Sequence, residues 1–131
     1  MTSMILCTRN CDERAAAILR QHYGRPYFLP PPGGGGGGGG KLEWIYLAGP
    51  GYRETIHMDV VDQPSWQAQL KGSKRWFLHP PPECYYQCES LEVTLKPGEI
   101  IVVDPTRWYH ETTVISSEYS ITVGAQFDTT W

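Results

Sequence analysis

The stretch that decides the fold is residues 65–79, which read SWQAQLKGSKRWFLH. Aromatic and apolar residues recur in both halves of this stretch, as they do in β-strands. Residues 71–73, KGS, have the composition of a tight turn, because glycine adopts backbone angles that other residues avoid. These features predict two strands, 65–70 and 74–79, joined by a hairpin turn.

The same strand pattern recurs on both sides of this stretch, from Lys41 to the end of the chain. The further predicted strands are 42–48, 54–59, 90–96, 99–104, 108–114 and 117–126. Glycine and proline separate them, as in Gly49-Pro50-Gly51 and Pro97-Gly98. Eight short strands without a helix between them predict an all-β fold, either a barrel or a sandwich.

The residues before Lys41 have a different composition. Residues 11–22, CDERAAAILRQH, predict a short helix with an apolar stripe. Residues 30–40 are three prolines followed by eight glycines, which cannot bury apolar surface and predict a flexible connector. This tract is either a natural simple-sequence expansion or a designed replacement for a deleted loop. The predicted organisation is an N-terminal helical flank (1–29), a linker (30–40) and a barrel (41–131).

Composition excludes several classes of function. The chain has 131 residues, enough for one domain, and a formal net charge of -3. Its Lys and Arg residues form no block, so we expect no nucleic-acid footprint. The sequence contains no apolar run of membrane-spanning length and no signal-peptide pattern, so we expect a soluble, untargeted chain whose compartment and oligomeric state stay open.

The four cysteines form two CxxxC pairs, Cys7/Cys11 and Cys84/Cys88. Reduced thiols, disulfides and a four-thiolate zinc site are the three interpretations of such a pattern. The flanking residues lack the glycine-containing turn of a zinc knuckle, so we favour reduced or disulfide-bonded cysteines.

A candidate metal site begins at His57-Met58-Asp59, at the end of a predicted strand. Residues two apart in a strand project to one face, so this imidazole and carboxylate can meet one metal ion. His110, in the predicted strand 108–114, is the best candidate for a third ligand. Two histidines and one carboxylate form the facial triad of non-haem iron(II) oxygenases. H-x-D alone is a weak signal, and the alternative is two polar groups that face water at a strand end.

The order of the surrounding segments favours the metal site. After His57-Met58-Asp59 come SWQAQL at 65–70 and KGSKRW at 71–76, and then KPGEIIVV at 96–103, WYH at 108–110 and SITV at 120–123. Together they resemble the Jumonji-C (JmjC) oxygenases of the cupin superfamily, and are closest to the JmjC protein hydroxylases. The resemblance extends from about Trp44 to Asp128. It implies a cupin-type double-stranded β-helix, or jelly-roll barrel, of about eight strands with a short N-terminal helix.

The resemblance also implies ligands and a co-substrate. His57, Asp59 and His110 match the iron(II) ligands, and Lys74 matches the lysine that pairs with the distal carboxylate of 2-oxoglutarate. A dicarboxylate in a partly dry barrel needs such a fixed cation. The alternative for Lys74 is an ordinary surface lysine beside a turn.

Three further residues match co-substrate positions of the family less closely. Thr122 matches a polar position on the last strand, and Gln67 lies where the family often has Asn. Thr55 is shifted by one from a position that is often Thr in the family and is Glu54 here, and a shift of one residue reverses the face of a strand. Gly124 stands where relatives commonly have Asn.

The function implied is that of a 2-oxoglutarate-dependent oxygenase, which hydroxylates a peptide or protein side chain or demethylates it through hydroxylation. One alternative is a non-catalytic cupin that binds a metal or ligand, favoured by Gly124 and the glycine tract. Another is a cupin that uses a different metal for non-redox chemistry.

Of the remaining aromatic residues, Trp66 and Trp108 are close in sequence to the candidate ligands and either line the mouth of the site or pack in the core. Tyr52, with Arg53 in the same loop, is a candidate substrate contact. The others are assigned to the core: Trp44, Tyr46, Trp76, Phe77 and Tyr119.

Overall fold

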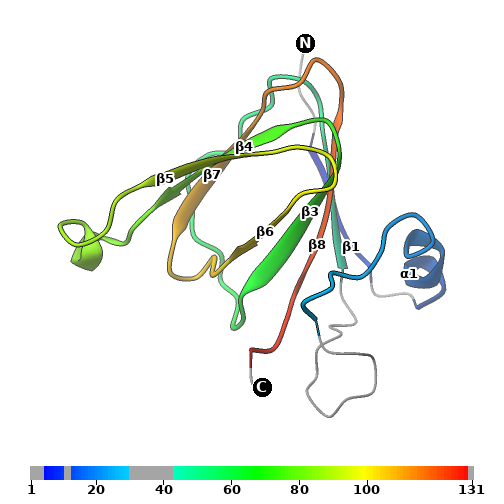
Figure 1. Cartoon of the computed structure of the whole chain (residues 1–131), viewed down its shortest axis with the longest axis horizontal. Helices are drawn as coiled ribbons and strands as arrows, with labels where there is room; N and C mark the ends of the chain where they lie inside the picture. Colours follow the sequence, from blue (N-terminus) through cyan, green and yellow to red (C-terminus); the bar gives the residue numbers. More distant parts are fainter. Residues whose placement is uncertain (1–4, 11–12, 30–42, 130–131) are drawn as a thin grey trace.

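Two antiparallel sheets form the walls of an open barrel in the computed structural model, which describes residues 5–10, 13–29 and 43–129 (Figure 1). The first sheet has the order β1-β2-β8-β3-β6 and the second the order β5-β4-β7. The strands are β1 (Ile5–Asn10), β2 (Glu43–Ala48), β3 (Ser65–Lys71), β4 (Lys74–His79), β5 (Leu91–Leu95), β6 (Ile100–Val103), β7 (Tyr109–Val114) and β8 (Ser120–Gln126). This architecture confirms the predicted all-β cupin-type barrel.

The helices of the described residues are short. They are α1 (Glu13–Leu19) and the 3-10 helix η1 (Pro82–Cys84). None of the described helices has the length and apolar character that crossing a membrane requires. The predicted helix 11–22 corresponds to α1, which is shorter. Residues 11 and 12 lie outside the described part of the chain.

The turn at 71–73 carries the chain from one sheet to the other. β3 pairs with β6 and β8, whereas β4 pairs with β5 and β7. Gly72 has a φ of 68°, and a Cβ there would lie 2.7 Å from the carbonyl oxygen of Tyr119, so the turn requires glycine. The predicted turn is present, but the predicted hairpin is wrong, because turn chemistry does not decide which strands pair.

Side chains alternate regularly on the strands that line the barrel. Along β4 the buried residues are Lys74, Trp76 and Leu78, and along β7 they are His110, Thr112 and Val114. Because successive side chains point to opposite faces, these two sets line the interior of the second sheet. The interior face of this sheet is thus partly polar, which is unusual for a packed core.

The apolar core has two parts on either side of the first sheet. Trp76, Leu78 and Leu95 of the second sheet meet Val103 of the first, so this cluster lies between the sheets. The other cluster lies on the opposite face of the first sheet. It consists of Trp66, Val123, Ala125 and Phe127, and Tyr23, Phe28 and Leu29 from the segment after α1 pack against it. The N-terminal flank therefore covers the outer face of the first sheet.

The structure departs from the predicted strands in two places. Residues 54–59 form no strand, and residues 53–57 contact β7 through isolated bridges at Arg53↔Thr113 and His57↔His110. β1 was not predicted, and it pairs with β2 through long-range hydrogen bonds that no local pattern indicates. The predicted linker, 30–40, lies outside the described residues, so the proposed division of the chain stays a prediction.

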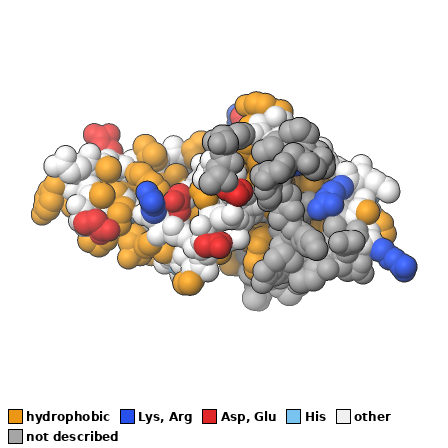
Figure 2. All heavy atoms as spheres, turned by 90° about the horizontal axis from the view of Figure 1, so that it is seen from below, with side chains coloured by type: hydrophobic (Ala, Val, Ile, Leu, Met, Phe, Trp, Pro, Cys, Tyr) orange, Lys and Arg blue, Asp and Glu red, His pale blue; other side chains and the backbone are white. Residues whose placement is uncertain are grey.

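The surface view shows charged groups spread singly over one face (Figure 2). The Lys and Arg side chains of the described residues that are visible in this view lie apart from one another. In the turn region after β4, Cys84 and Cys88 are free thiols, half-buried and exposed respectively. Cys11 lies outside the described residues, so the state of the first cysteine pair stays a prediction.

Candidate metal centre

His57 and Asp59 lie in an extended segment that runs beside β7. The backbone N–H of His57 donates to the carbonyl of His110 (3.0 Å), and the N–H of His110 donates back to the carbonyl of His57 (2.9 Å). This reciprocal pair places the two imidazoles opposite one another, with ring centres 4.3 Å apart. The N–H of Asp59 donates instead to the carbonyl of Pro105 (2.9 Å), so the segment leaves β7 after His57 rather than continuing as a strand.

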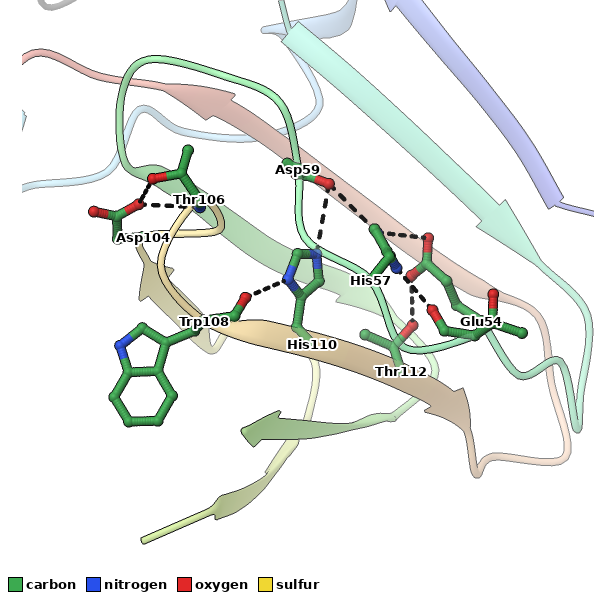
Figure 3. Close-up of polar contacts among 9 residues, drawn as sticks. Glu54, His57, Asp59, Asp104, Thr106, Trp108, His110 and Thr112 are labelled. Carbon is green, nitrogen blue, oxygen red and sulfur yellow. Dashed lines mark hydrogen bonds and ion pairs between the residues drawn. The ribbon is translucent and has the colours of Figure 1, made fainter. Parts of the chain in front are cut away.

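The three candidate ligands meet at one point (Figure 3). Asp59 Oδ1 lies 3.3 Å from His57 Nε2 and 3.6 Å from His110 Nε2, and the three ligand atoms lie within 4.8 Å of one another. Two ligands at about 2.1 Å from one ion and at right angles to each other are about 3 Å apart. Small side-chain movements would therefore close these atoms around a single ion. We call His57, Asp59 and His110 the metal-centre group.

Hydrogen bonds orient both imidazoles. His57 Nδ1 lies 2.7 Å from the carbonyl oxygen of Thr55, and His110 Nδ1 lies 3.0 Å from that of Trp108. A carbonyl oxygen only accepts, so each Nδ1 carries the proton and donates. In the neutral ring each Nε2 keeps a lone pair that faces Asp59, which is the arrangement that a metal-binding histidine requires.

The metal-centre group is closed on one side and open on the other. His110 is buried, and its ring lies against Trp76, with ring centres 6.1 Å apart. His57 and Asp59 have side chains that are 36% and 39% exposed. A bound ion would therefore rest against the barrel wall and remain accessible from the side of His57 and Asp59.

An unpaired donor beside His110 also fits a bound group. Trp76 is 2% exposed, and its indole nitrogen Nε1 has no hydrogen-bond partner among the described residues. A buried donor without a partner costs roughly 1–3 kcal/mol. An acceptor atom of a group bound next to His110 would remove that cost. The donor set and this orphaned N–H together fit a metal ion with a small polar ligand.

A second polar cluster lies in the barrel interior, on β3, β4 and β8. Thr122 Oγ1 donates to Gln69 Oε1 (3.0 Å), and Gln69 Nε2 donates to Ser120 Oγ (2.8 Å). Lys74 Nζ lies 5.6 Å from the centre of the Tyr46 ring, and Tyr46 is the register partner of Thr122. We call Gln69, Lys74, Ser120 and Thr122 the buried polar group. Lys74 is only 4% exposed, so it is not the surface lysine of the alternative interpretation.

The other sequence-predicted residues lie elsewhere. Thr55 is exposed, and its carbonyl rather than its hydroxyl contacts the metal-centre group. Gln67 is half-buried on β3, and a Cβ at Gly124 would lie 2.8 Å from Gln67 Cγ and 2.5 Å from the carbonyl oxygen of Trp66. Gly124 is therefore a point of close packing, where an Asn side chain would not fit without movement.

Sequence reasoning missed three residues near these groups. Gln69 is fully buried and follows Gln67 by two, so strand alternation alone could have indicated it. Tyr46 was assigned to the core but lies beside Lys74. Glu54 directs its carboxylate toward His57 and Thr112, as Figure 3 shows. The family resemblance pointed to the position of Glu54 as one that is often Thr, but it did not predict these contacts, because they depend on how an irregular segment pairs with β7.

Two of the remaining assignments concern exposed positions. Tyr119 was assigned to the core but is 68% exposed, because β8 begins only at Ser120 and Tyr119 lies in the preceding turn. Arg53 contacts both carboxylate oxygens of Glu111 at 3.1 Å on the outside of β7. Tyr52 lies in the same loop as Arg53. The pKa of its hydroxyl is raised above the ordinary value, first by burial and second by the negative charge of Glu54.

Comparison with known proteins gives two relatives by sequence, whereas no family model matches the chain. One is the arginine-specific demethylase JMJ20 of Arabidopsis thaliana, 30% identical over 104 residues that cover 60% of this chain and 22% of the relative. The other is the 2-oxoglutarate and iron-dependent oxygenase JMJD4 of Danio rerio, 27% identical over 106 residues that cover 60% of this chain and 25% of the relative. The chain thus spans about a quarter of the length of these relatives.

Solved structures share the fold at low sequence identity. The cupin domain of Drosophila melanogaster CENP-C superposes with a TM-score of 0.54 at 10% identity, covering 64% of this chain and 55% of that one. Oxalate decarboxylase from Bacillus subtilis superposes with a TM-score of 0.55 at 16% identity, covering 66% of this chain and 21% of that one. The chain therefore has a cupin fold and is similar in sequence to the JmjC oxygenases.

Proposed function

We propose that this JmjC-like cupin is an iron(II)- and 2-oxoglutarate-dependent oxygenase that acts on a peptide or protein side chain. One observation carries the proposal. Two imidazole Nε2 atoms and one carboxylate oxygen, from His57, Asp59 and His110, converge while both Nδ1 atoms are held by carbonyls. Two histidines and a carboxylate that leave coordination positions open are the ligand set of non-haem iron(II) oxygenases.

The roles of the metal-centre group follow from its geometry. His57, Asp59 and His110 would hold the iron, which together with 2-oxoglutarate and oxygen supplies the oxidising power for attack on a C–H bond. The carbonyls of Thr55 and Trp108 fix the rings, so the ligands need little reorganisation on binding. His110 and Trp76 form the dry wall behind the ion, and the exposed side at His57 and Asp59 faces the substrate.

The buried polar group would bind the far carboxylate of 2-oxoglutarate. Lys74 would supply the cation, and the hydroxyl of Thr122 on the neighbouring wall would exchange its bond to Gln69 for one to the carboxylate. The strand register supports this pairing. His110 is opposite Leu78, which is four residues from Lys74, or about 13 Å along β4. A lysine side chain and a five-carbon dicarboxylate together can span that separation.

Gln67 and Thr55 take smaller parts in the proposal. Gln67, half-buried next to Gly124, would contribute an amide to the same pocket from β3. Thr55 would act through its carbonyl, by holding the ring of His57. For substrate class, the name of JMJ20 indicates a demethylase specific for arginine, and demethylation of that kind starts by hydroxylation of an N-methyl group. A protein side chain is therefore the substrate that we propose here.

The experiment is an anaerobic titration of 2-oxoglutarate into the iron(II)-loaded protein, followed by visible absorption. The bidentate chelate of iron(II) and a 2-oxo acid gives a visible charge-transfer band. We expect the band with wild type and no band with His110→Ala. Metal binding to wild type without a band at any 2-oxoglutarate concentration would contradict the proposal.

A non-catalytic, metal-holding cupin is the second candidate. The close contact of Gly124 with Gln67 favours it, because that position carries no side chain able to reach a co-substrate. The same titration separates the two functions. Iron binding without the chelate band would support the second candidate.

A further inference from the structure

The indole N–H of Trp76 is a buried donor that lacks an acceptor among the described residues. Trp76 is 2% exposed, and its Nε1 makes no hydrogen bond there. Its two partners in the strand register do not supply one. Val93 has an apolar side chain, and the hydroxyl of Thr112 donates to Glu54 Oε2 (3.1 Å). Because an indole has one donor and no acceptor, this is the single polar atom of the side chain.

The neighbouring residue, Arg75, shows why this donor is exceptional. Arg75 Nε is also buried and unpaired, but Arg75 lies on the outer face of β4 and its Nη1 is 3.6 Å from Glu92 Oε1. Its guanidinium therefore keeps an ion pair without Nε. The indole has no second donor, and a buried polar group in a folded protein almost always has a partner. A bound molecule that carries an acceptor would supply that partner for Trp76.

Trp76 lies between the metal-centre group and Lys74 on the interior face of the second sheet. Lys74, Trp76 and Leu78 alternate inward along β4, and Leu78 is the register partner of His110. Trp76 is thus about 7 Å along the strand from each level. Its ring stacks on the ring of His110, with centres 6.1 Å apart and planes at 28°. A ligand that extends from the metal centre to Lys74 must therefore pass the indole.

We propose that the Trp76 N–H donates a hydrogen bond to an oxygen atom at the metal-bound end of 2-oxoglutarate. The middle of this molecule is two methylene groups, which accept no hydrogen bond, so the acceptor lies at one of its ends. The far carboxylate is assigned to Lys74, and the stacking of Trp76 on His110 favours the other end. This inference rests on the proposed function and adds a co-substrate-binding residue to it.

The two residues would then recognise opposite ends of the co-substrate. The compound 2-oxopentanoate has the same five-carbon chain and the same metal-binding end, but it lacks the far carboxylate. Removing the N–H of Trp76 should therefore weaken the binding of both acids by a similar factor. Removing the cation of Lys74 should weaken the binding of 2-oxoglutarate alone.

The first experiment is an anaerobic titration of each acid into the iron(II)-loaded whole chain, followed by the visible charge-transfer band. Trp76→Phe removes the N–H and keeps an aromatic ring. The matched control is Trp66→Phe, because Trp66 is 4% exposed and packs on the opposite face of the first sheet. A second readout needs no substitution. It is the proton resonance of the Trp76 indole N–H in the wild-type chain loaded with diamagnetic zinc(II), recorded with and without 2-oxoglutarate.

We expect Trp76→Phe to bind both acids roughly tenfold to a hundredfold more weakly than wild type, the effect of losing a hydrogen bond to a charged group. Trp66→Phe should match wild type, and the indole resonance of Trp76 should shift when 2-oxoglutarate binds. Weaker binding of 2-oxoglutarate alone would overturn the assignment to the metal-bound end. An indole resonance that does not move while the ligand binds would overturn the role of Trp76 and leave the proposed function standing. Absence of the chelate band in wild type would overturn both.

Discussion

The metal-centre group and the buried polar group lie in one barrel but are built differently. His57 and Asp59 come from an extended segment that contacts β7 through isolated bridges, and their side chains are more than one-third exposed. The buried polar group comes from regular strands, and Gln69 and Thr122 are 0% exposed. Under the proposed function, the exposed group would be accessible to a substrate. The buried group would interact strongly with a bound carboxylate, because electrostatic interactions are stronger away from water.

The largest effect is expected at the metal-centre group. Replacing His57, Asp59 or His110 with Ala removes one of three ligands, which should weaken iron(II) binding by at least roughly a hundredfold, beyond the range for outer-shell residues. The barrel should remain folded in His57→Ala, because that side chain is 36% exposed. Anaerobic iron(II) titration, with circular dichroism for folding, checks both points. Near-wild-type binding in all three variants would remove the metal assignment.

The next largest effect is expected at Lys74. If Lys74 pairs with the distal carboxylate, Lys74→Ala should cost about 2–5 kcal/mol, or roughly thirtyfold to several thousandfold in 2-oxoglutarate affinity. Iron binding should persist, because Lys74 is not a ligand. The control is Lys71→Ala, whose side chain is 55% exposed and pairs with Glu118 on the surface. Titration of 2-oxoglutarate into each iron-loaded protein measures the difference, and equal affinities would remove the Lys74 assignment.

A stability effect of intermediate size is expected from the hydrogen bonds of the buried polar group. Gln69→Leu leaves the hydroxyls of Thr122 and Ser120 without their partner, which should lower the free energy of unfolding by about 1–3 kcal/mol. Thr122→Val removes the hydroxyl that donates a hydrogen bond to Gln69 Oε1. The double variant no longer contains the Thr122 hydroxyl that Gln69→Leu leaves without a partner. Its decrease in the free energy of unfolding should therefore be smaller than the sum of the decreases in the two single variants. Urea unfolding of the four proteins gives the coupling, and strictly additive losses would contradict a shared network.

The sequence predicted the two groups unequally, and the reason is physical. His57, Asp59 and Lys74 were recognised from spacing in motifs that resemble the JmjC family, and strand alternation on β4 then accounts for the inward position of Lys74. Glu54 was noted only as a departure from the family's Thr, and its contacts were not predicted, because its orientation depends on a register between an irregular segment and β7 that is set by long-range hydrogen bonds. β1 was missed for the same reason. Local patterns predict strands, but they do not predict partners.

The smallest effect is expected at the ion pair between Arg53 and Glu111, on the outside of β7. Arg53 meets both oxygens of Glu111 at 3.1 Å, but its side chain is 67% exposed, so water screens the pair. Exposed ion pairs contribute about 0.2–1 kcal/mol, and Arg53→Ala should lower the free energy of unfolding by no more than that. Salt should weaken the effect further, because about 0.15 M ionic strength already screens exposed charges over roughly 8 Å. Metal affinity should change little, because the reciprocal backbone bonds between His57 and His110 remain. Urea unfolding at low and high salt, with an iron(II) titration, measures both quantities. A large, salt-independent loss of metal affinity would show that the ion pair between Arg53 and Glu111, rather than the backbone bridge, positions His57. The metal-centre group would then be held by side chains as well as by backbone, and its contrast with the buried polar group would be smaller.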